Sequence, residues 1–344
     1  MRRLLLLAAG LLLAACDDGG GGGEGYPFED FAWLAAAPDA RNDRLCTEAA
    51  DPSAAADKIF IDCRIEGERF APHDRPPETE PPLVMAYNLE RGFEVDAMIE
   101  AMRDGSVLPR PDVLLVSEVD RGCARTDHRH VARDLAQALQ MNYLYAVEFV
   151  ELDWSDGPDS TLLAACEHGN AILSRYPLGN ARAIRHAEQE PWYYRGESRL
   201  GGRVAMAADA WIGDGFVHLY AVHYESNVGE QPRDAQAVET AEDALARPHP
   251  AIVGGDLNSG FYVVDLMSGT DSDRTVKPFL ERGFVDAHAD LELPDRVTAP
   301  HSGFILDLVL GLRAGFSKPG VCPDSDCGSL SDHLPVWVDL VLER

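Results

Sequence analysis

Basic residues are scarce in this chain. Its 344 residues include 30 Lys and Arg against 58 Asp and Glu, which gives a formal net charge of −28 at pH 7. A surface of this charge repels polyanions, and phosphate neutralisation supplies most of the affinity of proteins for duplex nucleic acid. Nucleic acid is therefore disfavoured as a partner, although a local basic cleft would override the average. We expect a monomer.

Long apolar runs are absent beyond the first 15 residues, so no other segment is expected to span a membrane. Residues 4–15 are apolar and follow the charged start MRR, and the run is too short for a mature transmembrane helix. These are the features of an export signal. The run ends in LAAC at residues 13–16, which resembles the lipobox of bacterial lipoproteins, where the chain is cut before a Cys that is then lipidated. The alternative is an ordinary signal peptide cut near Ala15.

The segment after Cys16 is rich in glycine and contains no apolar anchor, so residues 16–25 are expected to form a flexible tether. Loss of residues 1–15 removes two arginines and changes the formal charge from −28 to −30. The sequence thus predicts a soluble domain outside the cytoplasm, attached through lipidated Cys16 to a bacterial membrane on its periplasmic side or at the cell surface.

Cysteine pairs with the CxxC spacing of zinc sites are also absent. Seven cysteines are present, and if Cys16 carries lipid six remain, an even number that in an exported protein favours disulfides. Pairing by proximity gives Cys46–Cys63, Cys123–Cys166 and Cys322–Cys327. This is one of about fifteen connectivities, and a zinc site is the alternative interpretation.

After an extension over residues 26–82, strand and helix patterns alternate from residue 83 to residue 344, with no internal repeat. Helical spacing occurs at 95–103, 131–139 and 233–245. Apolar, β-branched and aromatic runs predict strands at 83–89, 113–119, 143–152, 171–174, 205–211, 217–223, 251–254, 304–310 and 334–342. Helices interspersed among many strands predict a layered α/β sandwich with mixed sheets.

The stretch AIVGGDLNS at residues 251–259 is the strongest candidate for a site. It predicts a buried strand that ends in a tight turn at Gly254 and Gly255 and then presents Asp256 and Asn258. An acid at this position can hold a metal or accept a proton, and an amide can donate to a phosphoryl oxygen. An Asx turn that caps a loop is the alternative.

Other polar residues are placed in the same way, at or just beyond apolar strands. A carboxylate is costly to bury there unless it is paired or bound to a metal. Several carboxylates that converge predict a site for a hard cation, and the histidines add acid–base capacity. These residues are Asn88, Glu118, His223, Asp307, Asp332 and His333.

Seven short motifs, in this order, resemble the endonuclease/exonuclease/phosphatase superfamily from about residue 82 to the end. They are AYNL (86–89), VSEVD (116–120), GNAILSRYP (169–177), VHY (222–224), GDLN (255–258), ILD (305–307) and SDHLP (331–335). The resemblance implies the fold of pancreatic deoxyribonuclease, a four-layer α/β/β/α sandwich with two mixed β-sheets packed face to face. It also implies a catalytic domain over residues 83–344.

The resemblance further implies a Mg²⁺ site, with Mn²⁺ as the alternative ion, formed by Asn88, Glu118 and Asp332. It makes Asp256 the acid that positions or deprotonates the attacking water and Asn258 the amide that contacts the phosphoryl group. The remaining catalytic residues it implies are His333, the Asp307 that orients His333, and a second histidine, His223.

Two substrate-binding candidates are weaker. Asn170 is as well explained by turn geometry, and Arg203, like Arg199, is either a clamp for a substrate phosphate or part of a salt bridge. Four other histidines are expected to be ordinary loop residues: His128, His130, His168 and His301.

The sequence therefore favours a Mg²⁺-dependent extracytoplasmic hydrolase that acts on a small or lipid-linked phosphodiester or phosphomonoester. The alternatives are a secreted nuclease that degrades DNA or RNA and, in another class, a surface binding protein without catalysis. The loops expected to choose the substrate are residues 153–168, 188–202 and 259–274.

Overall fold

The computed structural model describes residues 65–72, 80–151, 166–190, 192, 199–226, 230–259 and 275–342. The predicted signal peptide, the tether with Cys16, and most of the extension lie outside these ranges. The strands are β1 (Glu66–Glu68), β2 (Leu83–Arg91), β3 (Val113–Arg121), β4 (Asn142–Glu151), β5 (Glu167–Ser174), β6 (Leu178–Arg185), β7 (Arg199–Gly201), β8 (Val204–Ile212), β9 (Gly215–His223), β10 (Ala251–Asp256), β11 (Val285–Asp286), β12 (Asp307–Leu312), β13 (Gly315–Val321) and β14 (Val336–Val341).

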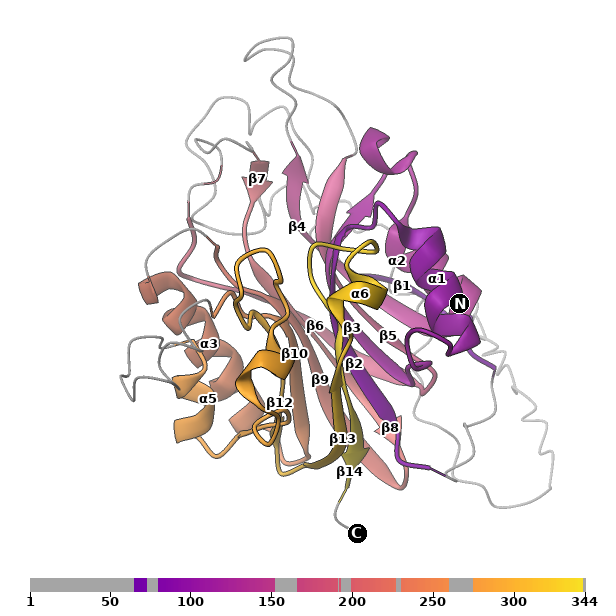
Figure 1. The fold of residues 1–344 in the computed structure, drawn as a ribbon. Coiled ribbons are helices and arrows are strands. Elements are labelled where there is room, and N and C mark those ends of the chain that lie inside the picture. The colour runs from indigo at the N-terminus through magenta and orange to yellow at the C-terminus, as the bar shows by residue number, and fades with distance from the viewer. Residues whose placement is uncertain are drawn as a thin grey trace, which may run out of the picture.

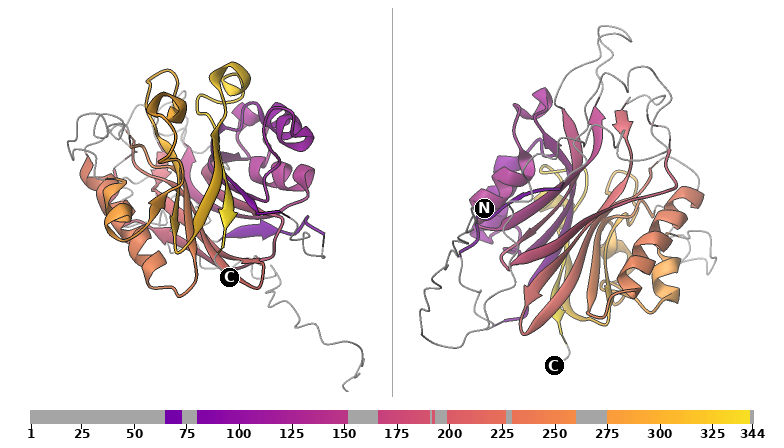
Figure 2. Two further views of the ribbon diagram at one scale, coloured as in Figure 1. Left: turned by 60° about the horizontal axis from the view of Figure 1, so that its bottom comes forward. Right: turned by 180° about the vertical axis from the view of Figure 1, so that it is seen from behind.

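The helices are fewer than the strands. They are α1 (Val95–Asp104), α2 (Val131–Leu139), α3 (Glu230–Leu245), α5 (Lys277–Glu281) and α6 (Asp324–Cys327), with short 3₁₀ turns η5 (Ala124–Thr126) and η7 (Leu293–Arg296). In Figures 1 and 2, α1 and α2 cover one face, α3 and α5 cover the opposite face, and two layers of strands lie between them.

Two mixed sheets form the inner layers. Within the described residues, the first sheet has the order β1-β4-β5-β3-β2-β14-β13 with β7 paired to β4, and the second has the order β11-β12-β10-β9-β8-β6. The pairs β2–β3 and β9–β10 are parallel, and the other pairs are antiparallel. The predicted four-layer α/β/β/α sandwich is thus confirmed.

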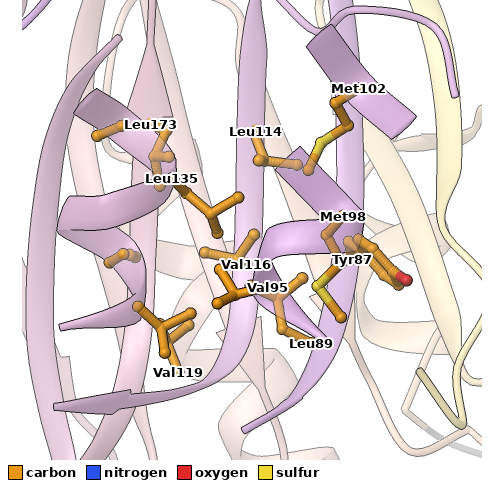
Figure 3. Close-up of a cluster of buried hydrophobic side chains, with 14 of the residues drawn as sticks. Tyr87, Leu89, Val95, Met98, Met102, Leu114, Val116, Val119, Leu135 and Leu173 are labelled. Carbon is orange, nitrogen blue, oxygen red and sulfur yellow. The ribbon is translucent and has the colours of Figure 1, made fainter. Parts of the chain in front are cut away.

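Three buried clusters separate the four layers, and the alternation of side chains along each strand produces them. In β2, Met85 and Tyr87 pack in the cluster under α1 and α2, while Val84 and Ala86 pack between the sheets. Figure 3 shows the first cluster, in which Met98 and other α1 side chains approach the sheet. The third cluster joins the second sheet to α3 and α5. Both faces of each sheet are therefore buried, which explains the continuous apolar runs.

Most predicted elements are present within one to four residues of their predicted ends, and α2 matches its predicted bounds. The sequence pattern missed β1, β6, β7, β11, β13, α5 and α6. Strand β6 (LGNARAIR) and strand β13 (GFSKPGV) are half-buried edge strands, so they carry charged residues, Gly or Pro in place of an apolar run. Strand β1 belongs to the predicted extension and pairs with β4.

The predicted turn at Gly254 and Gly255 is wrong, because β10 continues through both glycines to Asp256. The glycines are needed for close packing. A Cβ on Gly254 would lie 2.7 Å from Leu115 Cδ1. A Cβ on Gly255, whose φ is +141°, would lie 2.0 Å from the carbonyl oxygen of Val222. Gly254 therefore allows the two sheets to approach each other next to Asp256, and Gly255 allows β10 to lie close to β9 within the second sheet.

Two of the three predicted disulfides are present, Cys123–Cys166 and Cys322–Cys327. The third, Cys46–Cys63, lies outside the described residues. None of the helices in the described part of the chain has the length and apolar character needed to cross a membrane.

Candidate active site

The predicted site residues gather at one edge of the sandwich because of strand direction. The parallel strands β2 and β3 carry Asn88 and Glu118 near their carboxyl ends, and the parallel strands β9 and β10 end at His223 and Asp256. Strand β12 is antiparallel to β10, so Asp307 at its beginning reaches the same edge. The side chain of Asn88 donates to Asp256 Oδ2 at 3.1 Å and so joins the two sheets.

Asp256 lies at the centre of this group. It is paired in register with His223 on one side and with Asp307 on the other. Its Oδ2 is 3.5 Å from His223 Nε2 and 3.9 Å from His333 Nε2. Burial raises the pKa of Asp256 to about 7; the adjacent carboxylates act in the same direction, and His333 opposes them. A carboxylate with such a pKa is suited to accept a proton near neutral pH.

Glu118 lies in an irregular stretch of β3. The register with β5 shifts between Val116 and Val119, and Glu118 has a φ of +52°, which is uncommon for a residue with a Cβ. Its Oε1 accepts from Asn88 at 3.3 Å, and its Oε2 is 3.2 Å from Arg91. Burial alone would raise the pKa of Glu118, but His223, His168 and Arg91 hold it below the usual range. Glu118 is therefore an ionised carboxylate.

His333 is held by the carboxylate that the sequence assigned to it. Its Nδ1 lies 2.7 Å from Asp307 Oδ2, which leaves Nε2 directed toward Asp256. Burial opposes protonation, but Asp307 and Asp256 raise the pKa of His333 well above its ordinary value. The ring is thus protonated at neutral pH and can donate a proton from Nε2.

His223 is in the opposite state. Burial and the guanidinium of Arg203 hold its pKa well below the ordinary value, so the ring is neutral. Its Nε2 is 3.9 Å from Glu118 Oε1, and its Nδ1 is 3.8 Å from Glu148 Oε2. That Nδ1 has no hydrogen-bond partner among the described residues.

Asn258 and Asp332 lie at the same edge on loops. Asn258, with a φ of +50°, donates from its backbone to Asp256 Oδ1 at 2.8 Å and from Nδ2 to the carbonyl of Tyr224 at 2.9 Å. These bonds fix the amide next to Asp256 and leave a second N–H. Asp332 is exposed and lies beside Glu90, which accepts its backbone N–H at 3.0 Å.

The two weaker substrate-binding candidates are buried behind the site. Asn170 donates to Glu148 at 2.9 Å and to the carbonyl of Val204 at 2.8 Å. Arg203 is 1% exposed, and its guanidinium lies 3.3 Å from Glu148 and 3.6 Å from Glu225. Both side chains therefore contact Glu148, and Arg203 belongs to a buried ion-pair network.

Sequence reasoning missed two residues at this edge. Glu148 is fully buried within the apolar strand β4, and an acid in such a run was the signal that would have identified it. His168 was expected to be a loop histidine, but it lies in β5 with no exposed surface and pairs with Asp120 at 3.1 Å. Its position follows from the pairing of Asp120 with His168 across β3 and β5, which the sequence did not reveal.

The oxygen-rich side of the site fits a hard divalent cation. Asn88, Glu118 and Asp332 supply carboxylate and amide oxygens, the donors that Mg²⁺ prefers. Burial and the Glu118 charge raise the pKa of Asp332, although His333 opposes them. Burial and the charge of Asp332 likewise raise the pKa of Glu90. A cation would relieve this excess of negative charge. Two groups also have the proximity of metal ligands: Glu118–His168–His223 and Asp256–Asp307–His333.

Comparison with other proteins gives a consistent result. Uncharacterized protein YbhP of Escherichia coli K12 is 24% identical to this chain over 265 residues, which are 75% of this chain and 96% of YbhP. A solved endonuclease/exonuclease/phosphatase from Beutenbergia cavernae has a TM-score of 0.58 at 19% identity, with 76% of this chain and 72% of that chain covered. A family protein from Leptotrichia buccalis has a TM-score of 0.54 at 12% identity, with 75% and 99% covered.

At these identities the solved structures establish similarity of fold alone. The sequence profile described as the Endonuclease/Exonuclease/phosphatase family, by contrast, matches residues 85–333, which include all the catalytic and metal-binding candidates. The chain therefore belongs to the endonuclease/exonuclease/phosphatase family.

Proposed function

We propose that this protein is a Mg²⁺-dependent phosphoester hydrolase that acts outside the cytoplasm on a small or lipid-linked phosphodiester or phosphomonoester. The observation that carries the proposal is the position of Asp256, with His223 and His333 on either side within 3.9 Å and Asn88 bonded to it. Family membership supports hydrolysis of a phosphoester as the reaction class.

The side chains have separate roles in this proposal. Asp256 positions the attacking water and accepts its proton, and Asn258 donates to a phosphoryl oxygen. His333, protonated and held by Asp307, donates from Nε2 to the developing negative charge. A divalent cation held by Asn88, Glu118 and Asp332 would stabilise charge on the phosphoryl oxygens. Mn²⁺ is the alternative ion.

The proposed compartment and substrate class are supported by chemistry elsewhere in the chain. Disulfides persist in oxidising compartments, and two are present. They support export, and the LAAC sequence supports anchorage to the membrane through Cys16. The protein is proposed to be a monomer. The excess of 58 acidic over 30 basic residues disfavours polyanionic substrates. The arginines near the site already form ion pairs within the protein, Arg91 with Glu118 and Arg203 with buried carboxylates.

A panel of phosphoesters tests the proposal. The full chain is assayed on a generic phosphodiester, a phosphomonoester and a phospholipid with Mg²⁺, with Mn²⁺ and with EDTA. We expect turnover that needs the cation and that is lost in Glu118→Ala and His333→Ala. His218→Gln is the matched control, because this buried histidine also pairs with a carboxylate, Asp209, but lies five residues before His223 on β9. Undiminished turnover in the Glu118 and His333 variants would refute the roles.

The family description also includes nucleases, so plasmid DNA and an RNA oligonucleotide belong in the same panel. We expect little cleavage of either at physiological salt, because a strongly acidic protein does not accumulate polyanions. Rapid degradation of a nucleic acid, with weak turnover of the other esters, would replace the small or lipid-linked substrate by the nuclease alternative.

A further inference from the structure

Three side chains behind the catalytic edge have the arrangement of metal ligands. Glu118, His168 and His223 each offer one ligand atom, and these atoms lie within 4.8 Å of one another. They come from three strands, β3, β5 and β9, so the group forms where the two sheets meet. Two of the three ligands are imidazoles, in contrast to the oxygen donors of Asn88, Glu118 and Asp332.

His168 is oriented as a ligand would be. Its Nδ1 lies 3.1 Å from Asp120 Oδ1, and Asp120 is fixed in turn by Arg125 through contacts of 2.6 and 2.7 Å. An Nδ1–H that donates to this carboxylate leaves the lone pair on Nε2. The ring is completely buried, and its Nε2 has no hydrogen-bond partner among the described residues. An unpaired polar atom in such a place is costly unless another group satisfies it.

The other two ligands are also placed to hold a metal. His223 is 3% exposed, and its Nε2 lies 3.9 Å from Glu118 Oε1. Glu118 is the most exposed member, with 19% of its side chain accessible, which gives a route from solvent. The nearby positive charge of Arg203 is balanced by Glu148 and Glu225. A cation here would therefore not meet an uncompensated guanidinium.

We propose that Glu118, His168 and His223 bind Zn²⁺, a divalent cation of borderline softness. This position is separate from the Mg²⁺ position formed by Asn88, Glu118 and Asp332, and the two positions share Glu118. Imidazole nitrogen suits Zn²⁺, whereas Mg²⁺ prefers oxygen. Tetrahedral Zn²⁺ with ligands at about 2.0–2.2 Å requires ligand atoms about 3.3–3.6 Å apart, so small side-chain rotations close the group. Three protein ligands leave the fourth position open, as in zinc sites that bind water or substrate.

Co²⁺ titration in the presence of saturating Mg²⁺ tests the site without any assay of activity. Co²⁺ replaces Zn²⁺ and absorbs visible light when its ligands include nitrogen in a tetrahedral arrangement. The full chain, stripped with EDTA and refilled with Mg²⁺, is expected to bind one Co²⁺ that Mg²⁺ does not displace, with visible bands. His168→Gln is expected to lose these bands. Asp120→Asn, which removes the support of His168, is expected to weaken binding by about 10–100-fold.

His218→Gln is the control and is expected to leave Co²⁺ binding unchanged, because it removes an equally buried imidazole outside the group. X-ray absorption of the Zn²⁺-loaded wild-type protein gives an independent measurement should His168→Gln fail to fold. Two imidazoles around the zinc would support the site. One imidazole would place the zinc at Asp256–Asp307–His333 and overturn the proposal, as would a His168→Gln spectrum and affinity equal to those of wild type.

Discussion

The two histidines that flank Asp256 differ in charge although they lie at nearly equal distances from it, 3.5 Å for His223 and 3.9 Å for His333. Both rings are largely buried, so burial lowers the pKa of each. The groups behind the rings make the difference. The carboxylate of Asp307 contacts His333 at 2.7 Å, whereas the guanidinium of Arg203 acts on His223.

The difference shows how one site can offer two kinds of chemistry. On the His333 side, two carboxylates keep the imidazole protonated, so it can act as a donor. On the His223 side, the neutral ring offers a lone pair and therefore suits a cation. Neighbouring charges thus give the two imidazoles different protonation states, and therefore different possible roles. Each role can be tested directly.

Replacement of His333 should have the largest effect. His333→Ala removes the donor, and we expect kcat/KM for a phosphodiester with Mg²⁺ to fall by about 10²–10⁴-fold. His223→Ala leaves the donor intact and should cause a smaller loss. Steady-state kinetics of both variants at pH 7 make the comparison. Equal losses, or a greater loss in His223→Ala, would show that the two sides do not differ as described.

Arg203 is the next most sensitive position, because it is buried against Glu148 and Glu225. Arg203→Met leaves both carboxylates without their cation, and we expect the free energy of unfolding to fall by about 3–5 kcal/mol. Arg182→Met is the control. Arg182 is partly exposed and pairs with Asp243 at 3.0 Å, so its loss should cost at most about 1 kcal/mol. Urea denaturation measures both. An unchanged stability with a raised KM for Arg203→Met would restore its predicted role as a substrate clamp.

Each side of the site also has its own disulfide, and the two enclose loops of different length. Cys123–Cys166 spans 43 residues near Asp120 and His168, while Cys322–Cys327 spans 5 residues before the loop with His333. By loop entropy, replacing both cysteines with Ser should cost about 4 kcal/mol for the first pair and about 2 kcal/mol for the second. Urea midpoints of the two double variants test the order, and the reverse order would contradict it.

The smallest expected effect is a change of pH profile in Asp307→Asn. Asp307 raises the pKa of both His333 and Asp256, so its neutralisation lowers both. The proposed mechanism requires ionised Asp256 and protonated His333, so both limbs of the kcat/KM profile should move to lower pH, by about 1–3 units for His333. Asp209→Asn, which alters the carboxylate behind His218, should leave the profile in place. A profile that moves to higher pH would contradict the assignment.

The sequence predicted the layered fold and most of the residues that meet at the candidate site because these depend on local patterns. Apolar runs revealed the strands buried on both faces, and polar residues at their ends revealed Asp256, Glu118 and His223. The sequence did not predict the position of residues that depend on pairing between distant segments. His168 owes its place to the register of β3 with β5, and Glu148 to that of β4 with β5. Gly254 and Gly255 likewise serve contacts with Leu115 and Val222, which no local pattern contains.

Hydrolysis of a phosphodiester by Asp256→Asn tests the central claim most directly, because Asp256 lies between the two histidines and the change preserves its shape. With Mg²⁺ and the wild-type protein measured in parallel, we expect kcat/KM to fall by at least about 100-fold while the free energy of unfolding changes little. Wild-type turnover by this variant would contradict the account, since Asp256 is the carboxylate placed within 3.9 Å of both His223 and His333.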